Sequence, residues 1–214
     1  LDKIEVEFNT TDSTISSPSL DLFISERNSI VKSSRNLVPK DLKVTLIAHA
    51  SILLEFRGLK LLTDPWFDTT AFNGSWVPYP PASPSVKNLK PDIIIITHEH
   101  SDHFNEETLF QFNRETKILF PFFPNRRIEK KLRSLGFKNI KALFFREKYI
   151  IAENFFAQFY EPISNFNDAI FLLNFDGFKF LNEGNSLSQI VVSVINDFLN
   201  LEQVITPNIL LNIW

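Results

Sequence analysis

The chain has 214 residues, of which 22 are basic and 25 acidic, so its formal net charge is −3. This balance provides no basic field for nucleic acid and no polybasic segment for an anionic membrane. No apolar run reaches the roughly 20 residues of a transmembrane helix, and the absence of cysteine excludes disulfides and thiolate metal ligands. We therefore expect a cytoplasmic globular protein whose oligomeric state stays open.

The first 41 residues are predicted to form an N-terminal extension or linker. Residues 10–19 are rich in serine and threonine, which is typical of a loosely held arm, and residues 20–37 could form one short helix. Regular structure is expected to begin near Leu42. The domain proper is therefore predicted over residues 42–214.

One strand and a following β-hairpin can be predicted at the start of this domain from short apolar runs separated by turn residues. Residues 44–49 and 52–56 have the composition of strands, and Arg57-Gly58 then turns the chain into a third strand over residues 59–63. The long segment that follows, residues 64–91, is rich in proline and aromatic residues. Long loops in compact domains are usually functional or disordered, and the aromatic content favours an ordered lid or pocket wall.

A buried strand and a helix are predicted on either side of a histidine-rich loop. The continuous β-branched run over residues 93–97 is typical of a strand buried on both faces. Directly after it come His98, His100, Asp102 and His103, and then Asn105, which can cap a helix. In α/β folds, sites form at the carboxyl ends of sheet strands, so this loop is the candidate site.

The remaining chain is predicted to alternate between strands and helices. Its expected elements are a strand over 117–120, a helix over 125–135, strands near 140–145, 148–152, 155–160 and 169–175, a hairpin turn at Asp176-Gly177 into 178–182, a helix over 186–199 and a last strand over 204–214. This pattern indicates the α/β class.

The spacing H-x-H-x-D-H predicts metal binding. Alternate residues of an extended segment share a face, so His98, His100 and Asp102 can point together, and the adjacent His103 can serve a second ion. Neutral imidazoles and a carboxylate are preferred ligands of zinc and of iron. The alternative is a solvated loop that is rich in histidine by chance.

The chain resembles the metallo-β-lactamase superfamily over roughly residues 42–200. The resemblance rests on the H-x-H-x-D-H loop, on His49-Ala50-Ser51 followed by Thr63-Asp64-Pro65-Trp66-Phe67, and on the block from Asp176 to Asn185. These blocks are similar to the branch that holds ascorbate-phosphate lactonase, the N-acyl-phosphatidylethanolamine phospholipase D type and the metal domain of CMP-sialic-acid hydroxylase. The implied fold is an αββα sandwich of two mixed sheets, with its C-terminal part incomplete if the domain continues beyond Trp214.

The resemblance implies roles for the matched residues. His98 and His100 would hold a first metal, and Asp102 and His103 a second. Asp64 would lie behind a ligand imidazole and fix its orientation, although a plain turn residue before Pro65 is an equal alternative. His49 is expected in the pocket behind the ligands rather than in the core.

The later ligand positions of the family are degenerate in this chain. Ser164 stands where the resemblance implies a third histidine for the first metal, and Asn185 stands where it implies a bridging aspartate. We favour a weakened single-metal site over a site in which the lost ligands are replaced by Glu183, or by Glu161 or Asp168 beside Ser164. Metal should then be held less tightly than in a complete centre.

Three functions remain open. The favoured one is a metal-dependent hydrolase acting on an ester, lactone or phosphodiester of a small molecule, with Asp102 orienting a water. The cofactor would be one or two divalent ions, with zinc favoured over iron or manganese. The alternatives are an iron-dependent oxygenase component similar to CMP-sialic-acid hydroxylase, and a non-catalytic binding module.

Overall fold

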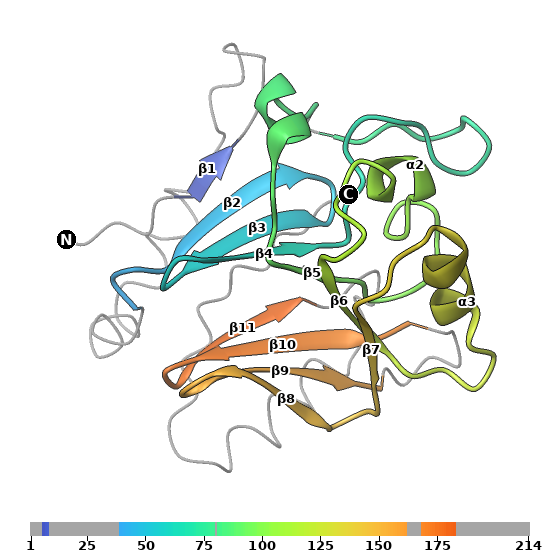
Figure 1. Cartoon of the computed structure of the whole chain (residues 1–214). Coiled ribbons are helices and arrows are strands. Elements are labelled where there is room, and N and C mark those ends of the chain that lie inside the picture. The colour runs from blue at the N-terminus through green and yellow to red at the C-terminus, as the bar shows by residue number, and fades with distance from the viewer. Residues whose placement is uncertain (1–5, 9–38, 80, 162–167, 183–214) are drawn as a thin grey trace, which may run out of the picture.

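Two β-sheets packed face to face form the framework of the protein (Figure 1). The computed structural model describes residues 6–8, 39–79, 81–161 and 168–182. Within these ranges the first sheet consists of β1 (Val6–Phe8), β2 (Lys43–Ala48), β3 (Ser51–Phe56), β4 (Leu59–Thr63), β5 (Ile93–Ile95), β6 (Lys117–Pro121) and β7 (Ile140–Leu143), in that order. The second consists of β11 (Phe178–Asn182), β10 (Ile170–Phe175), β9 (Phe155–Tyr160) and β8 (Lys148–Ala152).

Helices pack on the outer face of the first sheet. They are α2 (Glu106–Leu109), α3 (Arg127–Ser134) and the 3-10 helix η2 (Pro84–Asn88). This arrangement of two facing sheets with outer helices is the α/β sandwich expected from the sequence. None of the helices in the described ranges is long and apolar enough to cross a membrane. The helices predicted over 20–37 and 186–199 and the strand over 204–214 lie outside the described residues.

The pairing within the first sheet changes from antiparallel to parallel. Strands β2, β3 and β4 pair antiparallel, with the predicted hairpin between β3 and β4, whereas β4, β5, β6 and β7 run parallel. The sequence did not predict β1, which pairs in parallel with β2 from within the expected N-terminal extension. A strand of three residues is too short to give a periodic signal, so only the pairing reveals it.

Strand β5 is buried on both faces, as its continuous apolar run predicted. Ile93 and Ile95 belong to the core between the two sheets, whereas Ile94 and Ile96 belong to the core beneath the helices. The first core is closed from the second sheet by Phe155, Phe159, Phe171, Leu173 and Phe175. The second core is closed from the helical side by Leu109, Phe112, Ile128, Leu132 and Phe137.

Two hairpin turns join the sheets at the end away from the histidine loop. Arg57-Gly58 and Asp176-Gly177 each place two successive residues at positive φ, the backbone of a tight hairpin turn in which glycine is preferred at the second position. The Arg57 guanidinium pairs with the Asp176 carboxylate and donates to the Glu153 carbonyl at 3.2 Å. The β3–β4 hairpin is thereby tied to the β10–β11 hairpin.

Phenylalanine packing between the sheets should dominate stability. The Phe56 ring lies edge-on to Phe155 and Phe175, with centroids 5.4 and 5.0 Å away, and is 1% exposed. We expect Phe56→Ala to lower the free energy of unfolding by about 3–5 kcal/mol, since a buried ring is lost and a cavity remains. Urea unfolding would measure this. The control Phe110→Ala removes a ring that is 65% exposed and should change stability by less than about 1 kcal/mol.

The parallel strands determine where the functional residues gather. Asp64 follows β4 and the histidine loop follows β5, and the Asp64 amide donates to the Ile95 carbonyl at 2.8 Å. Carboxyl ends of neighbouring parallel strands meet at one edge of a sheet, which is where α/β folds form their sites.

Candidate metal centre

The histidine loop is held in a tight turn between β5 and α2. The His100 carbonyl accepts from the amides of His103 and Phe104 at 3.0 and 2.7 Å. Asn105 then caps α2, because its side chain accepts from the Thr108 amide at 2.9 Å. The predicted cap is confirmed, and the loop is fixed at both of its ends.

His98, His100 and Asp168 form the first group of potential metal ligands. One ligand atom from each lies within 4.8 Å of the others, and His98 Nε2 is 3.5 Å from Asp168 Oδ1. His98 and Asp168 are buried, whereas His100 is exposed. Asp168 comes from the segment that leads into β10, so the two sheets contribute jointly to this group.

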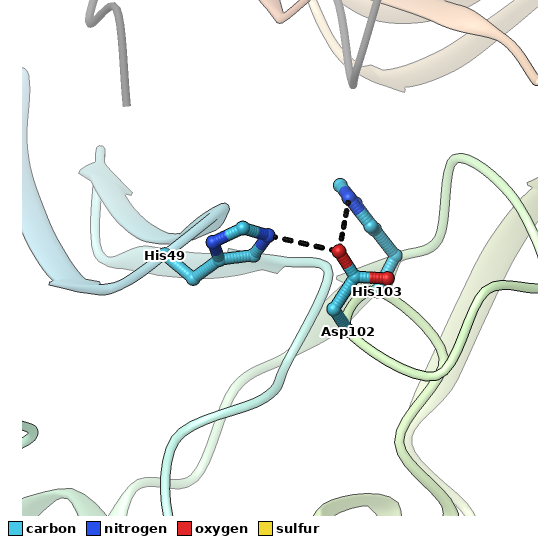
Figure 2. A group of neighbouring side chains, drawn as sticks. All are labelled: His49, Asp102 and His103. Carbon is cyan, nitrogen blue, oxygen red and sulfur yellow. Dashed lines mark hydrogen bonds and ion pairs between the residues drawn. The ribbon is translucent and has the colours of Figure 1, made fainter. Parts of the chain in front are cut away.

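His49, Asp102 and His103 form the second group (Figure 2). The Asp102 carboxylate lies between the two rings, with Oδ2 3.1 Å from His49 Nε2 and 3.6 Å from His103 Nε2. His49 comes from the turn between β2 and β3. The ring centroids of His98 and His103 are 4.0 Å apart, so the two groups are neighbours.

Asp64 supports the centre from behind. Its side chain is fully buried; Oδ1 accepts from the Thr97 amide and Oδ2 from the Thr97 hydroxyl, both at 2.8 Å. Asp64 Oδ2 also lies 3.0 Å from His103 Nδ1. Because an ionised carboxylate only accepts, His103 Nδ1 carries the proton and Nε2 presents its lone pair toward Asp102. Asp64 thus lies beside a histidine ring, the position that the family resemblance implied for it.

Thr97 extends this arrangement to the first group. Its single hydroxyl proton is donated to Asp64, so the same oxygen accepts from His98 Nδ1 at 2.9 Å. The Nε2 lone pair of His98 is left facing the first group. Burial lowers the pKa of His98 to about 2, with a further contribution from the neighbouring His103 and His100, so this imidazole is neutral at physiological pH. One buried carboxylate therefore orients a histidine in each group.

Two residues of the centre have an uncommon backbone conformation. His49 has φ of 48° and Asp64 φ of 36°, both in the left-handed region. Non-glycine residues in this region carry strain that the surroundings must hold in place, and such residues are concentrated at functional sites. We infer that this strained backbone serves to direct the His49 and Asp64 side chains into the centre.

The donor set fits a divalent cation. In the described ranges, Asp102 Oδ1 and Asp168 Oδ1 are buried and make no hydrogen bond, and neither carboxylate pairs with a lysine or arginine. Burial raises the pKa of Asp168, an effect that nearby His100 and His103 only partly offset. Buried carboxylates require compensation, and a metal ion bound by neutral imidazoles and carboxylates provides it.

Asp168 and His49 are the residues whose position the sequence did not predict. Asp168 was given little weight as a ligand and His49 was placed behind the ligands, yet each completes a group of three donors. Glu161, the other acid beside Ser164, is exposed at the end of β9 and in neither group. Ser164, Glu183 and Asn185 lie outside the described residues. The sequence feature that could have identified Asp168 as a ligand is its place close to Ser164, where the resemblance implies a third ligand.

The fold and the loop together define the class of protein. A sandwich of two sheets with H-x-H-x-D-H at the end of a buried parallel strand is the metallo-β-lactamase arrangement. Residues 43–207 match the family model described as the beta-lactamase superfamily domain, which is most of the chain. The chain therefore belongs to the beta-lactamase superfamily.

Three curated relatives match shorter segments. The chain is 34% identical over 101 residues (46% of the chain, 19% of the relative) to a protein of Mycolicibacterium smegmatis named as a Rieske 2Fe-2S iron-sulfur protein. It is 36% identical over 66 residues (30% and 26%) to a metal-dependent hydrolase of Pyrobaculum neutrophilum. It is 39% identical over 71 residues (32% and 11%) to the cytidine monophosphate-N-acetylneuraminic acid hydroxylase of Asterias rubens. The matches thus span about a quarter or less of these relatives.

A solved structure supports the fold. The isothiocyanate hydrolase from Delia radicum gut bacteria superposes with a TM-score of 0.59 at 20% identity, covering 73% of this chain and 68% of that one.

Proposed function

We propose that the chain is a metal-dependent hydrolase that binds divalent metal at two adjacent groups, His98–His100–Asp168 and His49–Asp102–His103. The observation that carries the proposal is the convergence of two histidines and one carboxylate in each group, with buried carboxylate oxygens that make no hydrogen bond among the described residues. The similarity to the metal-dependent hydrolase of Pyrobaculum neutrophilum supports it. Three protein ligands that leave an open position are typical of catalytic zinc.

The chemistry divides between the metal and Asp102. A divalent ion held by these two groups would supply Lewis-acid chemistry, namely polarisation of the bond to be cleaved and acidification of a water. Burial raises the pKa of Asp102, but the hydrogen bond with His49 and the nearby His103 outweigh it, so the pKa lies below its ordinary value. The carboxylate is therefore ionised at neutral pH, and Oδ1 can accept a proton from the attacking water.

The favoured substrate is an ester, lactone or phosphodiester of a small molecule, and the favoured ion is zinc, with iron or manganese as alternatives. Asp64 and Thr97 act as positioning residues, because they touch the imidazoles and not the reacting atoms. Their hydrogen bonds hold the Nε2 lone pairs of His98 and His103 toward the metal positions.

The test of this proposal is substitution of Asp102. We expect Asp102→Asn to lower kcat by about 100-fold or more, because proton transfer by a positioned group contributes that much. The measurement is hydrolysis of a panel of esters, lactones and phosphodiesters by protein loaded with zinc, manganese or iron. Asp68→Asn is the matched control, since Asp68 accepts from Thr108 at 3.1 Å in the same region and belongs to neither group. Absence of hydrolysis across the panel by folded, metal-loaded protein would contradict the hydrolase.

The second candidate is the iron-dependent oxygenase component. Two histidines and one carboxylate are also the ligands of non-heme iron oxygenases, and Asp168 provides that carboxylate in the first group. The similarity to the Rieske-named protein and to the sialic-acid hydroxylase favours it. These 214 residues contain no cysteine, so a Rieske cluster would belong to another segment or protein. Oxygen consumption by iron-loaded protein with a chemical reductant, compared with hydrolysis, separates the two candidates.

A further inference from the structure

A group of large apolar side chains is exposed beside the metal centre. Phe72, Trp76, Val77 and Tyr79 are 40%, 53%, 69% and 59% exposed, and all lie between β4 and η2. The rings of Phe72 and Trp76 meet edge to face with centroids 5.0 Å apart. Clustered aromatic exposure of this kind marks a binding surface more often than isolated exposed residues do.

Phe72 and Trp76 are presented by a small hairpin, residues 71–76, which we call the aromatic hairpin. Ala71 and Trp76 exchange backbone hydrogen bonds of 3.0 and 3.2 Å. Phe72 has φ of 49°, an unusual backbone for a bulky residue, and its amide donates to Ser101 Oγ at 3.0 Å. The hairpin is therefore tied directly to the histidine loop in a conformation that must be held.

The aromatic hairpin stands next to the exposed ligand of the first group. The Phe72 and His100 ring centroids are 6.4 Å apart. The same loop is also anchored to the second group, because the His49 amide donates to the Tyr79 carbonyl at 2.8 Å and the buried Trp66 ring lies 5.0 Å from the His49 ring. A molecule resting on the Phe72–Trp76 ring pair would thus extend toward His100.

The charge of the loop between β4 and η2 indicates which kind of chemical group can bind to it. Residues 64–86 contain Asp64 and Asp68 but no lysine or arginine, so the loop offers no cation to a phosphate or carboxylate. Exposed aromatic rings bind a flat apolar group by stacking and edge-to-face contact.

We propose that the aromatic hairpin binds a neutral aromatic group of the substrate and positions the adjoining ester bond at His100. This inference rests on the proposed hydrolase function and narrows its substrates to neutral aryl esters. Phe72 and Trp76 are its specificity-determining residues.

Binding can be tested separately from hydrolysis. The probe is N-(2-naphthyl)acetamide, a neutral amide whose naphthyl fluorescence measures affinity in every variant. The indole N–H resonance of Trp76, which Trp76→Phe identifies by its loss, reports contact with the probe in the wild type and in Phe72→Ala. We expect a saturable shift in the wild type and a loss of affinity of about tenfold in Phe72→Ala and Trp76→Ala, as expected for an aromatic contact. Trp76→Phe keeps a ring and should retain most of the affinity. Ile150→Ala is the control, because Ile150 is 65% exposed but belongs to β8 in the other sheet.

Kinetics with 2-naphthyl acetate and ethyl acetate complete the test. Metal-loaded Phe72→Ala and Trp76→Ala should raise KM for the naphthyl ester about tenfold with kcat kept within about twofold, and should change kcat/KM for ethyl acetate much less than for the naphthyl ester. An unshifted Trp76 resonance, or binding of 2-naphthyl phosphate as tight as that of the neutral probe, would overturn the inference even if esters are cleaved. Binding of the probe at Trp76 without cleavage of any ester would support the aromatic site and reject the hydrolase.

Discussion

Replacing Asp168 by alanine is expected to lower the bound metal from two ions per chain to one. Asp168 is the carboxylate of the first group, and its buried Oδ1 lies 3.5 Å from His98 Nε2 without a hydrogen bond in the described ranges. Without it only two imidazoles remain, one of them exposed. Loss of a supporting partner alone costs about 10–100-fold in metal affinity, so loss of a direct ligand should weaken the first ion by about 100-fold or more.

Elemental analysis of metal-loaded, desalted protein would measure this change, with a competition titration for affinity. Asp168→Glu keeps the carboxylate and should retain part of the affinity. Glu161→Gln, which removes an exposed acid at the end of β9, should keep both ions. Two tightly held ions in Asp168→Ala would show that the first group is completed by another residue.

Replacing Asp64 by asparagine should destabilise the protein even without metal. The Asp64 carboxylate is fully buried and faces three donors, namely the Thr97 amide, the Thr97 hydroxyl and His103 Nδ1. An amide of the same shape turns its NH2 toward at least one of them in either orientation. We expect a loss of about 3 kcal/mol in the free energy of unfolding, the range for a buried polar group left unsatisfied beside charged or polar partners.

Urea unfolding of the metal-free protein isolates this effect from metal binding. Metal titration should then show weaker binding at both groups, because the Asp64 network orients one histidine in each. The matched control is Asp92→Asn, since Asp92 accepts a backbone bond from Lys60 at 2.9 Å on the exposed surface. Equal stability and equal metal affinity in Asp64→Asn and the wild type would mean that the carboxylate has no positioning role.

The parts of the centre that are local in sequence could be predicted. The H-x-H-x-D-H spacing is complete within the six residues from His98 to His103, so it is visible in the sequence alone. The apolar run before it indicates a strand buried on both faces, and Ile93 to Ile96 are buried in this way. For Asp64, the family resemblance implied a place behind a ligand imidazole, on equal terms with a plain turn residue before Pro65. Parallel pairing of β4 with β5 then places it beside the histidine loop.

The contributions from distant segments could not be predicted. Asp168 reaches His98 only because the second sheet packs on the first through a phenylalanine core, and no periodic pattern indicates how two sheets align. His49 reaches Asp102 through a left-handed backbone conformation that the sequence His-Ala-Ser does not signal. The expectation of a weakened centre gave Asp168 little weight, because the sequence alone does not show that tertiary packing brings Asp168 beside His98 and His100.

The most direct test of a metal centre formed by the two groups is a crystal structure of the metal-loaded protein with anomalous diffraction data. Data recorded at the absorption edges of zinc and iron would locate each ion and identify it. We predict one peak among His98, His100 and Asp168 and a second among His49, Asp102 and His103. A map with no peak at either group, or with metal bound only elsewhere on the chain, would contradict the account.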